Sequence, residues 1–471
     1  MAVEVDHFAP DQLVHLDREA PAGLRAQIEQ QLRAGVREGR LHPGTRLPSS
    51  RELAVRLGVA RGVVVEAYAQ LAAEGWIVTR QGSGTRVAPG TAAPEPDPEP
   101  WPFAQPMRHD FALGVPDLAA FPRSAWLRAM RRVLDRLPDA GLGHPDPRGA
   151  APLRTALAAY LGRQRGVVTT ADRIVITNGF WQALGLTCTV LRARGAKRLA
   201  MEDPSFLYHR MIAQRAGLET VPVPVDGAGM RTEELAATNA DAVLVTPAHQ
   251  SPTGAVMGPD RRTALLAWAH EADAFVIEDD YDAEHRYDRE PVGALQGHAP
   301  ERVIYGGTAS KTLAPALRLG WVAVPAGLAR AIALEKGLTD AGSPVLEQLV
   351  LADLIERGDL DRHLRRTRAA HRGRRAALAA AVEEHLPDCR LRGIAAGLHA
   401  QLDLPPGTDE RAVVVAAAHR GVRVEPLAPH RFRDGPAHPA PPALLLGFGA
   451  LSEPAIRHGI AELALAIDEV E

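Results

Sequence analysis

A proline-rich segment divides the sequence into two parts of unequal length. Positions 88–107 read APGTAAPEPDPEPWPFAQPM, with seven prolines and three acidic residues. Proline fixes its own φ angle and has no amide hydrogen to donate, so neither a helix nor a central strand can run through this stretch. We therefore expect a semi-extended, acidic linker over 89–107, one domain over 12–88 and a second domain over 108–471.

The composition excludes several classes of protein. Hydrophobic residues make up 46% of the 471 positions and charged residues 24%, which predicts a large core and excludes a disordered chain. The sequence has no run of about 18 apolar residues, and its start, MAVEVDHFAPDQ, lacks the features of a secretion signal. We therefore expect a cytoplasmic protein without a membrane span. Cys188 and Cys389 have no CxxC partner, which predicts free thiols.

The first part of the chain has the pattern of a DNA-binding module. Apolar residues four apart predict an amphipathic helix over 23–39, and Ser49 with Glu52 three residues later is a capping box that opens a second helix. A third helix is expected over 61–74, followed by a hairpin around 81–84. Helix, tight turn, helix and hairpin together predict a winged helix-turn-helix. Between positions 40 and 86, seven arginines against three acids add the local positive charge that attracts phosphate.

The second part alternates strand-like and helix-like segments. Apolar runs lie at 173–177, 198–202, 242–246, 274–280, 302–307 and 320–324. This alternation predicts an α/β fold with a largely parallel sheet covered on both faces, and such sheets bind ligands at the carboxyl ends of their strands. The C-terminal segment, with its long helical stretches, predicts a smaller α+β lobe.

Lys311 has the sequence surroundings that Schiff-base chemistry requires. A lysine used in this way must be partly desolvated, and neighbouring hydroxyl groups and an arginine suit a phosphate. The run from 302 to 319 supplies Gly306, Gly307, Thr308, Ser310 and Arg318 around this lysine. Pyridoxal 5′-phosphate needs both features, although a surface-loop lysine is the alternative. The other two lysines, Lys197 and Lys336, stand in charged or helical segments typical of an exposed surface.

Asp279 and Tyr281, at the end of another apolar run, suit the same cofactor. A pyridine nitrogen acts as an electron sink only while it is protonated, and a buried carboxylate maintains that state. Asp279 is therefore the candidate for this contact, and Tyr281 is the candidate donor to the phenolic oxygen O3′. A metal site at the strand end is the alternative, but the sequence places no histidine or further acid at ligand spacing.

Three weaker signals complete the predicted site. Gly179 and Phe180 stand between a strand and a helix start, where backbone N–H groups bind anions. Phe206 follows a third strand and can stack on a flat ring, although a plain core aromatic is equally consistent. The loop TPAHQSPTG at 246–254 brings polar side chains to a strand end. The combination in this order is more specific than any one signal.

These motifs resemble a known family. LPSSRELAVRLGVARGVVVEAYAQLAAEGW and QGSGTRV resemble the GntR-type winged helix, and TPAHQSPTG, IEDDYDAEHRY and GTASKTLAPALRLGW resemble fold-type I aminotransferases. Their fusion through a linker is similar to MocR-type (GabR-like) bacterial transcriptional regulators over nearly the whole chain. The resemblance implies a head-to-tail homodimer and pyridoxal 5′-phosphate, with Lys311 forming the internal aldimine, Asp279 at the pyridine nitrogen, Tyr281 at O3′ and Phe206 on the ring. It also implies phosphate binding by the Gly179 and Phe180 amides, Thr308, Ser310 and Arg318.

The sequence departs from the family pattern at three places. His144 stands where the family has a tyrosine that reaches the partner subunit's phosphate, and the segment 59–64 (VARGVV) lacks two hydroxyl residues of the usual recognition helix. At 444–448 (LLLGF) the carboxylate-binding arginine of aminotransferases is absent. Arg423, Arg431 or Arg433 would have to replace it, or no amino acid is bound.

The leading hypothesis is a transcription regulator that binds double-stranded DNA and senses pyridoxal phosphate or its adduct with an amino compound. A dimer predicts an operator with two half-sites, and the family implies target genes of vitamin B6 or of amino acid and amine metabolism. The expected DNA contacts are Arg46, Ser50, Arg51 and Arg61, with Gly82, Ser83 and Thr85 in the wing. The alternatives are an active aminotransferase with an added DNA-binding domain and a dimerisation scaffold without a sensing role.

Overall fold

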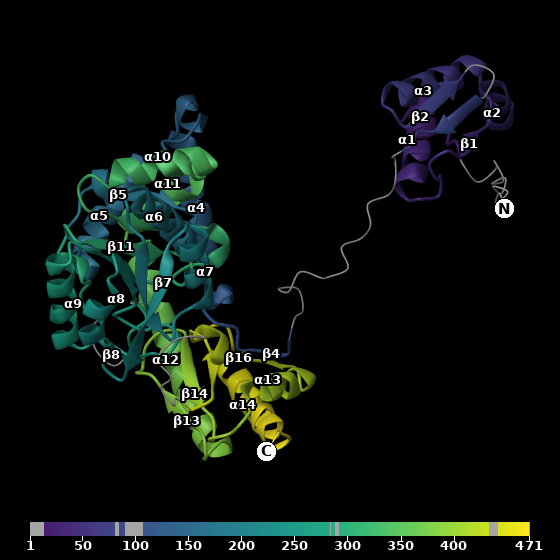
Figure 1. Ribbon diagram of the computed structural model, residues 1–471. Coiled ribbons are helices and arrows are strands. Elements are labelled where there is room, and N and C mark those ends of the chain that lie inside the picture. The colour runs from purple at the N-terminus through teal and green to yellow at the C-terminus, as the bar shows by residue number, and fades with distance from the viewer. Residues whose placement is uncertain are drawn as a thin grey trace. The chain divides into compact units, whose positions relative to one another are not determined.

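The computed structural model describes residues 14–80, 84–89, 107–282, 284–287, 292–432 and 441–470 (Figure 1). Most of the expected linker, positions 90–106, lies outside these residues. The chain divides into two compact units, Met1–Gln105 and Pro106–Glu471, and each is described by itself. No helix in the described parts of the chain is long and apolar enough to cross a membrane.

The first unit is a winged helix-turn-helix, as the sequence predicts. It contains helices α1 (Leu24–Arg37), α2 (Ser50–Leu57) and α3 (Arg61–Ala73) and strands β1 (Arg46–Leu47), β2 (Ile77–Arg80) and β3 (Gly84–Val87). The strands form one antiparallel sheet in the order β1-β3-β2. Apolar side chains of all three helices, including Ile28, Leu53 and Val64, share one buried core with residues of the sheet.

Local contacts explain the sharp turn between α2 and α3. The Ser49 side chain accepts a hydrogen bond from the Glu52 amide at 3.2 Å, which caps α2 as the sequence predicts. Gly58 ends α2 with a φ of +62°, a conformation that glycine adopts at little cost. The Tyr68 hydroxyl of α3 donates to the Pro48 carbonyl at 2.9 Å and fixes α3 against the residues that precede α2.

An eight-stranded sheet forms the centre of the second unit. Its order is β5-β12-β11-β10-β9-β6-β7-β8. The six predicted strands are present as β5 (Ile174–Thr177), β6 (Arg198–Asp203), β9 (Ala242–Val245), β10 (Phe275–Asp279), β11 (Val303–Thr308) and β12 (Gly320–Ala323). The pairings β6 with β7, β6 with β9, β9 with β10 and β10 with β11 are parallel, whereas β12 is antiparallel to both β5 and β11.

The sequence analysis missed two strands of this sheet, β7 (Glu219–Asp226) and β8 (Gly229–Met230). Proline at 222 and 224 weakens the strand signal of the segment ETVPVPVD, because proline cannot donate to a ladder. β7 nevertheless lies near the sheet edge, where its outer neighbour is only the two-residue β8. Missing donors cost least at that position.

Helices cover both faces of the sheet (Figure 1). Helices α6 (Phe180–Ala193), α7 (Leu207–Arg215) and α10 (Ala329–Asp340) pack on one face. On the other face lie α5 (Ala151–Arg165), α9 (Pro259–Glu271) and α11 (Val345–Glu356), with α4 (Arg123–Arg136) packed on α11. A short helix, α8 (Leu235–Thr238), precedes β9. The strands are apolar on both sides because neither face meets water.

The predicted C-terminal α+β lobe is also present. Its antiparallel sheet has the order β13-β14-β17-β16, from β13 (Arg390–Arg392), β14 (His399–Asp403), β16 (Glu425–Pro426) and β17 (Ala443–Gly447). Helices α12 (Asp359–His385), α13 (Glu410–His419) and α14 (Glu453–Asp468) pack with it. In addition, β4 (His109–Asp110) pairs with β15 (Val422–Arg423), so the first strand after the linker region belongs to this lobe.

A buried ion pair joins α5 to the end of β10. Arg165 Nε lies 2.7 Å from Asp280 Oδ2 and Nη2 lies 3.0 Å from Oδ1, with both side chains about 1% exposed. The Tyr305 hydroxyl donates to the same carboxylate at 2.6 Å. The charge on Asp280 is therefore compensated by two fixed donors inside the protein.

We predict that Arg165→Met destabilises the protein by about 3–5 kcal/mol, because it leaves the Asp280 carboxylate buried without its cation. Urea unfolding followed by circular dichroism measures this change. The matched control is Arg173→Met, which removes the exposed pair with Glu301 at 3.2 Å and is expected to cost about 0–1 kcal/mol. Equal effects of the two substitutions would contradict the argument.

Candidate functional site

The predicted cofactor residues gather at one edge of the large sheet. Asp279 is the last residue of β10, Thr308 is the last residue of β11, and Gly179 connects β5 to α6. β5 and β11 run in the same direction, because both pair antiparallel with β12. The carboxyl ends of these three strands therefore meet at the edge where the sequence analysis expects a ligand.

One side of this edge has the donors of an anion site. Gly179 caps α6 with a φ of +87° and no side chain over the helix start. Arg318 donates from Nη2 to the Asn178 carbonyl at 2.5 Å, and a Cβ at Gly179 would lie 2.9 Å from that nitrogen. The Thr308 hydroxyl donates to Ser310 Oγ at 2.9 Å. A helix N-terminus, a guanidinium and two hydroxyls suit a phosphate group.

Lys311 lies in the loop after β11 with its amine turned inward. Its Nζ donates to the Gly114 carbonyl at 2.7 Å, and a side chain at Gly114 would collide with this amine. Burial lowers the pKa of Lys311, while the carboxylates of Asp282 and Asp279 act in the opposite direction and Arg318 lowers it further. A desolvated amine of this kind reaches its neutral, nucleophilic form more readily than a surface lysine.

Asp279 is a buried carboxyl group without a fixed partner. Its side-chain atom Oδ1 has no hydrogen-bond partner among the described residues, and Oδ2 lies 3.9 Å from His209 Nε2. Burial, then the charges of Asp280 and Asp282, raise the pKa of Asp279 well above its usual value. His209 does not supply a compensating cation, because burial lowers its pKa to about 3. The free oxygen therefore fits a cationic N–H donor such as a protonated pyridine nitrogen.

Phe206 packs on His209, the residue next to this carboxyl group. Its ring centroid is 5.2 Å from that of His209, which in turn approaches Asp279, and 5.8 Å from that of His430 in a stacked arrangement. Trp181 and Tyr208 stack on each other at 4.9 Å next to Phe206. The site thus has an aromatic wall of the kind that a flat heterocycle requires.

Tyr281 is held by groups that the sequence analysis did not single out. Its hydroxyl lies 3.0 Å from His249 Nδ1, which lies 2.8 Å from Asp282 Oδ2. Burial and then the charge of Asp282 raise the pKa of Tyr281 well above its usual value, so the phenol keeps its proton. His209, His249, Asp282 and Gly114 are additional site residues. Two of them belong to motifs that the sequence analysis quotes, His249 to TPAHQSPTG at 246–254 and Asp282 to IEDDYDAEHRY at 277–287, but neither was assigned a role there.

The structure corrects one reading of the three lysines. Lys197 is exposed, as expected, but Lys336 is fully buried, at 0% exposure. Its amine lies 2.6 Å from Asp340 Oδ2 and 3.0 Å from Gln182 Oε1. The sequence around Lys336 is helical and partly charged, so it resembles an exposed helix. Asp340, four residues later, pairs with the amine and allows its burial, but nothing in the sequence indicates that this pair is buried. Its ion pair with Asp340 distinguishes it from Lys311.

The predicted DNA contacts lie on the winged helix-turn-helix unit. Arg46 on β1, Arg51 on α2 and Arg61 at the start of α3 are exposed, and none of the three forms an ion pair with a described residue. Ser50 is the first residue of α2, and Thr85 Oγ1 lies 3.3 Å from Thr79 Oγ1 on the neighbouring strand. Gly82 and Ser83 lie outside the described residues.

Two of the three arginines considered for an effector carboxylate can be placed. Arg423 lies 3.1 Å from Asp110 on β4. Arg431 donates to the Pro441 carbonyl at 2.9 Å and directly follows His430, which stacks on Phe206. Arg433 lies outside the part of the chain that the structure describes. Arg431 is therefore the described candidate nearest to the aromatic wall.

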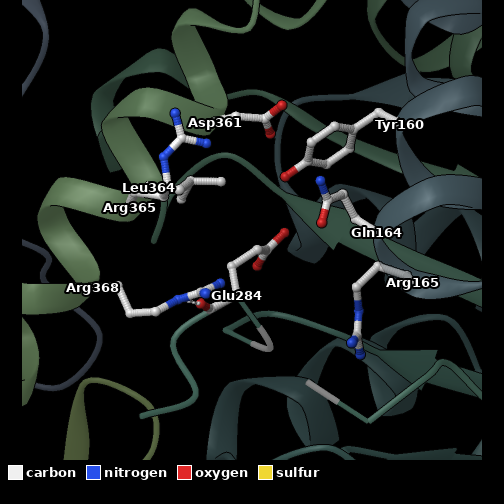
Figure 2. A pocket seen from close by; sticks show the side chains of 8 residues that line it. All are labelled: Tyr160, Gln164, Arg165, Glu284, Asp361, Leu364, Arg365 and Arg368. Carbon is white, nitrogen blue, oxygen red and sulfur yellow. Dashed lines mark hydrogen bonds between the residues drawn. The ribbon is translucent and has the colours of Figure 1, made fainter. Parts of the chain in front are cut away.

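A separate cavity of about 160 Å³ lies between α5, α12 and the segment after β10. Figure 2 shows Glu284 and Gln164 pointing toward its centre and Arg165 pointing away. Burial and then the charge of Asp280 raise the pKa of Glu284 to about 7, although Arg165 acts in the opposite direction. None of the predicted cofactor residues lines this cavity, so it is not the predicted site.

A layer of buried histidines supports the Lys311 loop. His285 Nε2 lies 3.1 Å from the Lys311 carbonyl, and His363 Nε2 lies 2.8 Å from the Thr312 carbonyl. His371 packs edge to face on His285 with a centroid distance of 5.0 Å. Neither ring nitrogen of His371 has a hydrogen-bond partner among the described residues. Burial, then the neighbouring His285, lower the pKa of His371 to about 3.

Known proteins match both units. The family model for aminotransferase class I and II matches residues 110–434, and that for bacterial regulatory proteins of the gntR family matches residues 24–87. The pyridoxine biosynthesis transcriptional regulator PdxR of Corynebacterium glutamicum is 35% identical, over 96% of this chain and 98% of its own. The probable rhizopine catabolism regulatory protein MocR of Rhizobium meliloti is 32% identical, over 97% and 96%.

Solved structures support the fold of the second unit. A Pyrococcus horikoshii kynurenine aminotransferase superimposes with a TM-score of 0.71 and 28% identity, over 78% of this chain and 92% of that one. Fold and site together define a DNA-binding protein built on an aminotransferase domain, with pyridoxal 5′-phosphate as its cofactor. The chain belongs to the MocR-type family of transcriptional regulators.

We predict that His371→Leu becomes more stable relative to the wild type as the pH falls. In the unfolded chain a histidine accepts a proton below its ordinary pKa of 6.5, whereas folded His371 accepts one only near pH 3. The folded wild type therefore loses stability over this interval, and the leucine variant avoids the loss. Between about pH 7.5 and pH 5 the difference should grow by about 2 kcal/mol. Urea unfolding at both pH values measures it, and a difference independent of pH would refute the prediction.

Proposed function

We propose that this protein binds pyridoxal 5′-phosphate covalently at Lys311 and uses the occupied site to control DNA binding. The observation that carries the proposal is that a desolvated lysine amine and a buried carboxyl group with one partnerless oxygen, Asp279 Oδ1, lie at the same edge of the sheet. When bound, the cofactor supplies an aldehyde that condenses with amines and a ring nitrogen that acts as an electron sink. The same site then senses either the cofactor or its adduct with an amino compound.

Each side chain has a distinct task in this proposal. Asp279 accepts a hydrogen bond from the pyridine nitrogen and gains a cation that compensates its burial. Tyr281 donates to O3′, and Phe206 covers the ring face. The Gly179 and Phe180 amides, with Thr308, Ser310 and Arg318, bind the phosphate. The anion donors described above support this assignment.

A regulator is favoured over a working aminotransferase. The relatives that match almost the whole chain, PdxR and MocR, are named as regulators. β17 (ALLLG) is completely buried and apolar and carries no arginine for a substrate carboxylate. By analogy with these relatives, the target genes belong to vitamin B6 or amine metabolism, and the protein acts in the cytoplasm, where its operator is located.

The regulator acts as a homodimer with a head-to-tail arrangement, which would present two heads to an operator with two half-sites. Exposed apolar side chains support self-association. Leu334 and Leu338 of α10 are 66% and 78% exposed, and Leu142 is 66% exposed. The segment after Leu142 lies against α10, since a Cβ at Gly337 would be 3.3 Å from Pro147. The exposed His144 belongs to this segment and is the candidate to reach the partner subunit's phosphate.

We predict that purified wild-type protein absorbs visible light with pyridoxal 5′-phosphate and that borohydride fixes the cofactor on Lys311. Lys311→Ala should lose the band and the response of DNA binding to the cofactor, because Lys197 is exposed and Lys336 is paired with Asp340. Lys197→Ala, at an exposed position, is the control and should retain both. Absorption spectroscopy, peptide mapping and DNA titration provide the measurements. An unchanged DNA response in Lys311→Ala would favour the dimerisation scaffold instead.

We also predict that Arg61→Ala weakens specific DNA binding by about 1–3 kcal/mol if Arg61 contacts a base, and lowers the salt slope by about one unit if it contacts only phosphate. Its position at the start of α3, without an ion pair among the described residues, leaves the guanidinium free for DNA. Arg56→Ala is the control, because Arg56 already pairs with Glu52 at 2.6 Å. Titrations at several salt concentrations separate the two cases. No change in affinity or slope would remove Arg61 from the interface.

A further inference from the structure

A buried histidine and carboxylate pair lies directly behind Tyr281. His249, in the loop after β9, is 3% exposed, and Asp282, just after β10, is 2% exposed. His249 Nδ1 lies 2.8 Å from Asp282 Oδ2 and 3.0 Å from the Tyr281 hydroxyl. Gly397 covers the pair with a φ of +68°, and a Cβ there would lie 2.6 Å from Asp282 Oδ2. The three polar groups are thus fixed in position.

The protonation states within the pair follow from the charges around it. Burial acts to raise the pKa of Asp282, but its contact with His249 lowers it more, and the net pKa lies below the usual value. Asp282 is therefore a carboxylate and can only accept hydrogen bonds. Consequently His249 carries its proton on Nδ1 and donates it to Asp282, with the Tyr281 oxygen as a second, weaker acceptor.

This arrangement affects where the Tyr281 proton goes. The carboxylate of Asp282 is also a hydrogen-bond acceptor within reach of the Tyr281 hydroxyl. Without the proton that His249 donates to Asp282, the carboxylate would attract the tyrosine proton more strongly, because hydrogen bonds to ionised groups are stronger than neutral ones. With His249 donating to Asp282, the carboxylate is a weaker acceptor for the tyrosine proton, so Tyr281 can donate it to a cofactor oxygen instead.

We propose that His249 and Asp282 are positioning residues that keep the Tyr281 hydroxyl as a hydrogen-bond donor to the phenolic oxygen of the cofactor. This inference rests on the proposed function, because it concerns a cofactor bound at Lys311. The titratable groups facing Tyr281 are His249, Asp279, Asp282 and His399. His399 does not replace His249 as a cationic partner of Asp282, because burial lowers the pKa of His399 to about 3.

A divalent metal ion is the rival explanation for the same side chains. The ligand atoms of His249, Asp282 and His399 lie within 4.8 Å of one another. However, Nδ1 of His249 already donates to Asp282, and a Cβ at Gly254 would lie 3.2 Å from Nε2, so backbone covers the other ring nitrogen. The geometry favours a hydrogen-bonded pair over a coordination site.

The test is the pH at which the visible band of the Lys311-bound cofactor changes. A hydrogen bond donated to the phenolic oxygen makes that oxygen less basic, so the proton it shares with the lysine nitrogen leaves at a lower pH. We expect His249→Leu to raise the midpoint by about one pH unit, in the same direction as Tyr281→Phe. The double variant should shift no further than Tyr281→Phe alone, because both changes remove one hydrogen bond.

His249→Asn is the matched control. Its amide nitrogen takes the place of Nδ1 and donates to Asp282, so the midpoint should stay near that of the wild type. A midpoint unchanged in His249→Leu, additive shifts in the double variant, or a shift in His249→Asn equal to that in His249→Leu would each overturn the inference. Stoichiometric metal in the purified wild type that is lost in His249→Asn would also overturn it.

A second readout does not need the cofactor. In the unloaded protein labelled with ¹⁵N-histidine, the signal that disappears in His249→Asn should show a proton on Nδ1, and a ring protonated on Nε2 alone would overturn the inference. This measurement also covers the case in which His249→Leu fails to fold. Failure of wild-type protein to retain cofactor at Lys311 would refute the proposed function, whereas retention without the expected shift would refute only the role of the pair.

Discussion

The candidate site of the second unit depends on two ionisable groups that are buried in the protein, the carboxyl group of Asp279 and the amine of Lys311. Asp279 and Lys311 lie at the ends of neighbouring strands, and burial acts against the charged form of each group. Asp279 keeps one oxygen without a hydrogen-bond partner among the described residues, and the Lys311 amine donates only to the Gly114 carbonyl. In the proposed function, a ligand with a protonated ring nitrogen and an aldehyde would engage both groups at once. Binding there is therefore worth more than the same contacts on the surface.

The sequence was sufficient to predict the fold and the residues at the strand ends. Apolar runs predict six of the eight strands of the large sheet, and Asp279, Thr308 and Gly179 all stand where such a run ends. Because carboxyl ends of parallel strands meet at one edge, residues far apart in the chain were expected to lie together. The sequence has only three lysines, which limits the candidates for the amine that binds the cofactor. Lys311 is distinguished from Lys197 by the glycine and hydroxyl residues around it.

The residues that sequence reasoning missed are those whose environment is created by tertiary packing. Lys336 looks exposed in its helix, yet Asp340 and Gln182 pair with it inside the protein. His249 and Asp282 are 33 positions apart, so no local spacing reveals their contact. Gly114 reaches Lys311 from 197 positions away, through a backbone carbonyl that carries no sequence signal. The prolines of β7 cause the opposite error, because they suggest that this segment is not a strand. The segment is a strand near the edge of the sheet, and that position is set by the tertiary structure and not by the local sequence.

The C-terminal lobe links the site to the linker through continuous contacts. β14 supplies His399, which stacks on Tyr281, and the segment before β17 supplies His430, which stacks on Phe206. The same lobe contains β15, whose pairing with β4 anchors the chain two residues after Met107. In the proposed function, a ligand that draws the lobe toward the large sheet would therefore also move the point at which the linker region ends. Ligands with different contacts to His399 and His430 would move it by different amounts, and only such a difference can shift DNA binding.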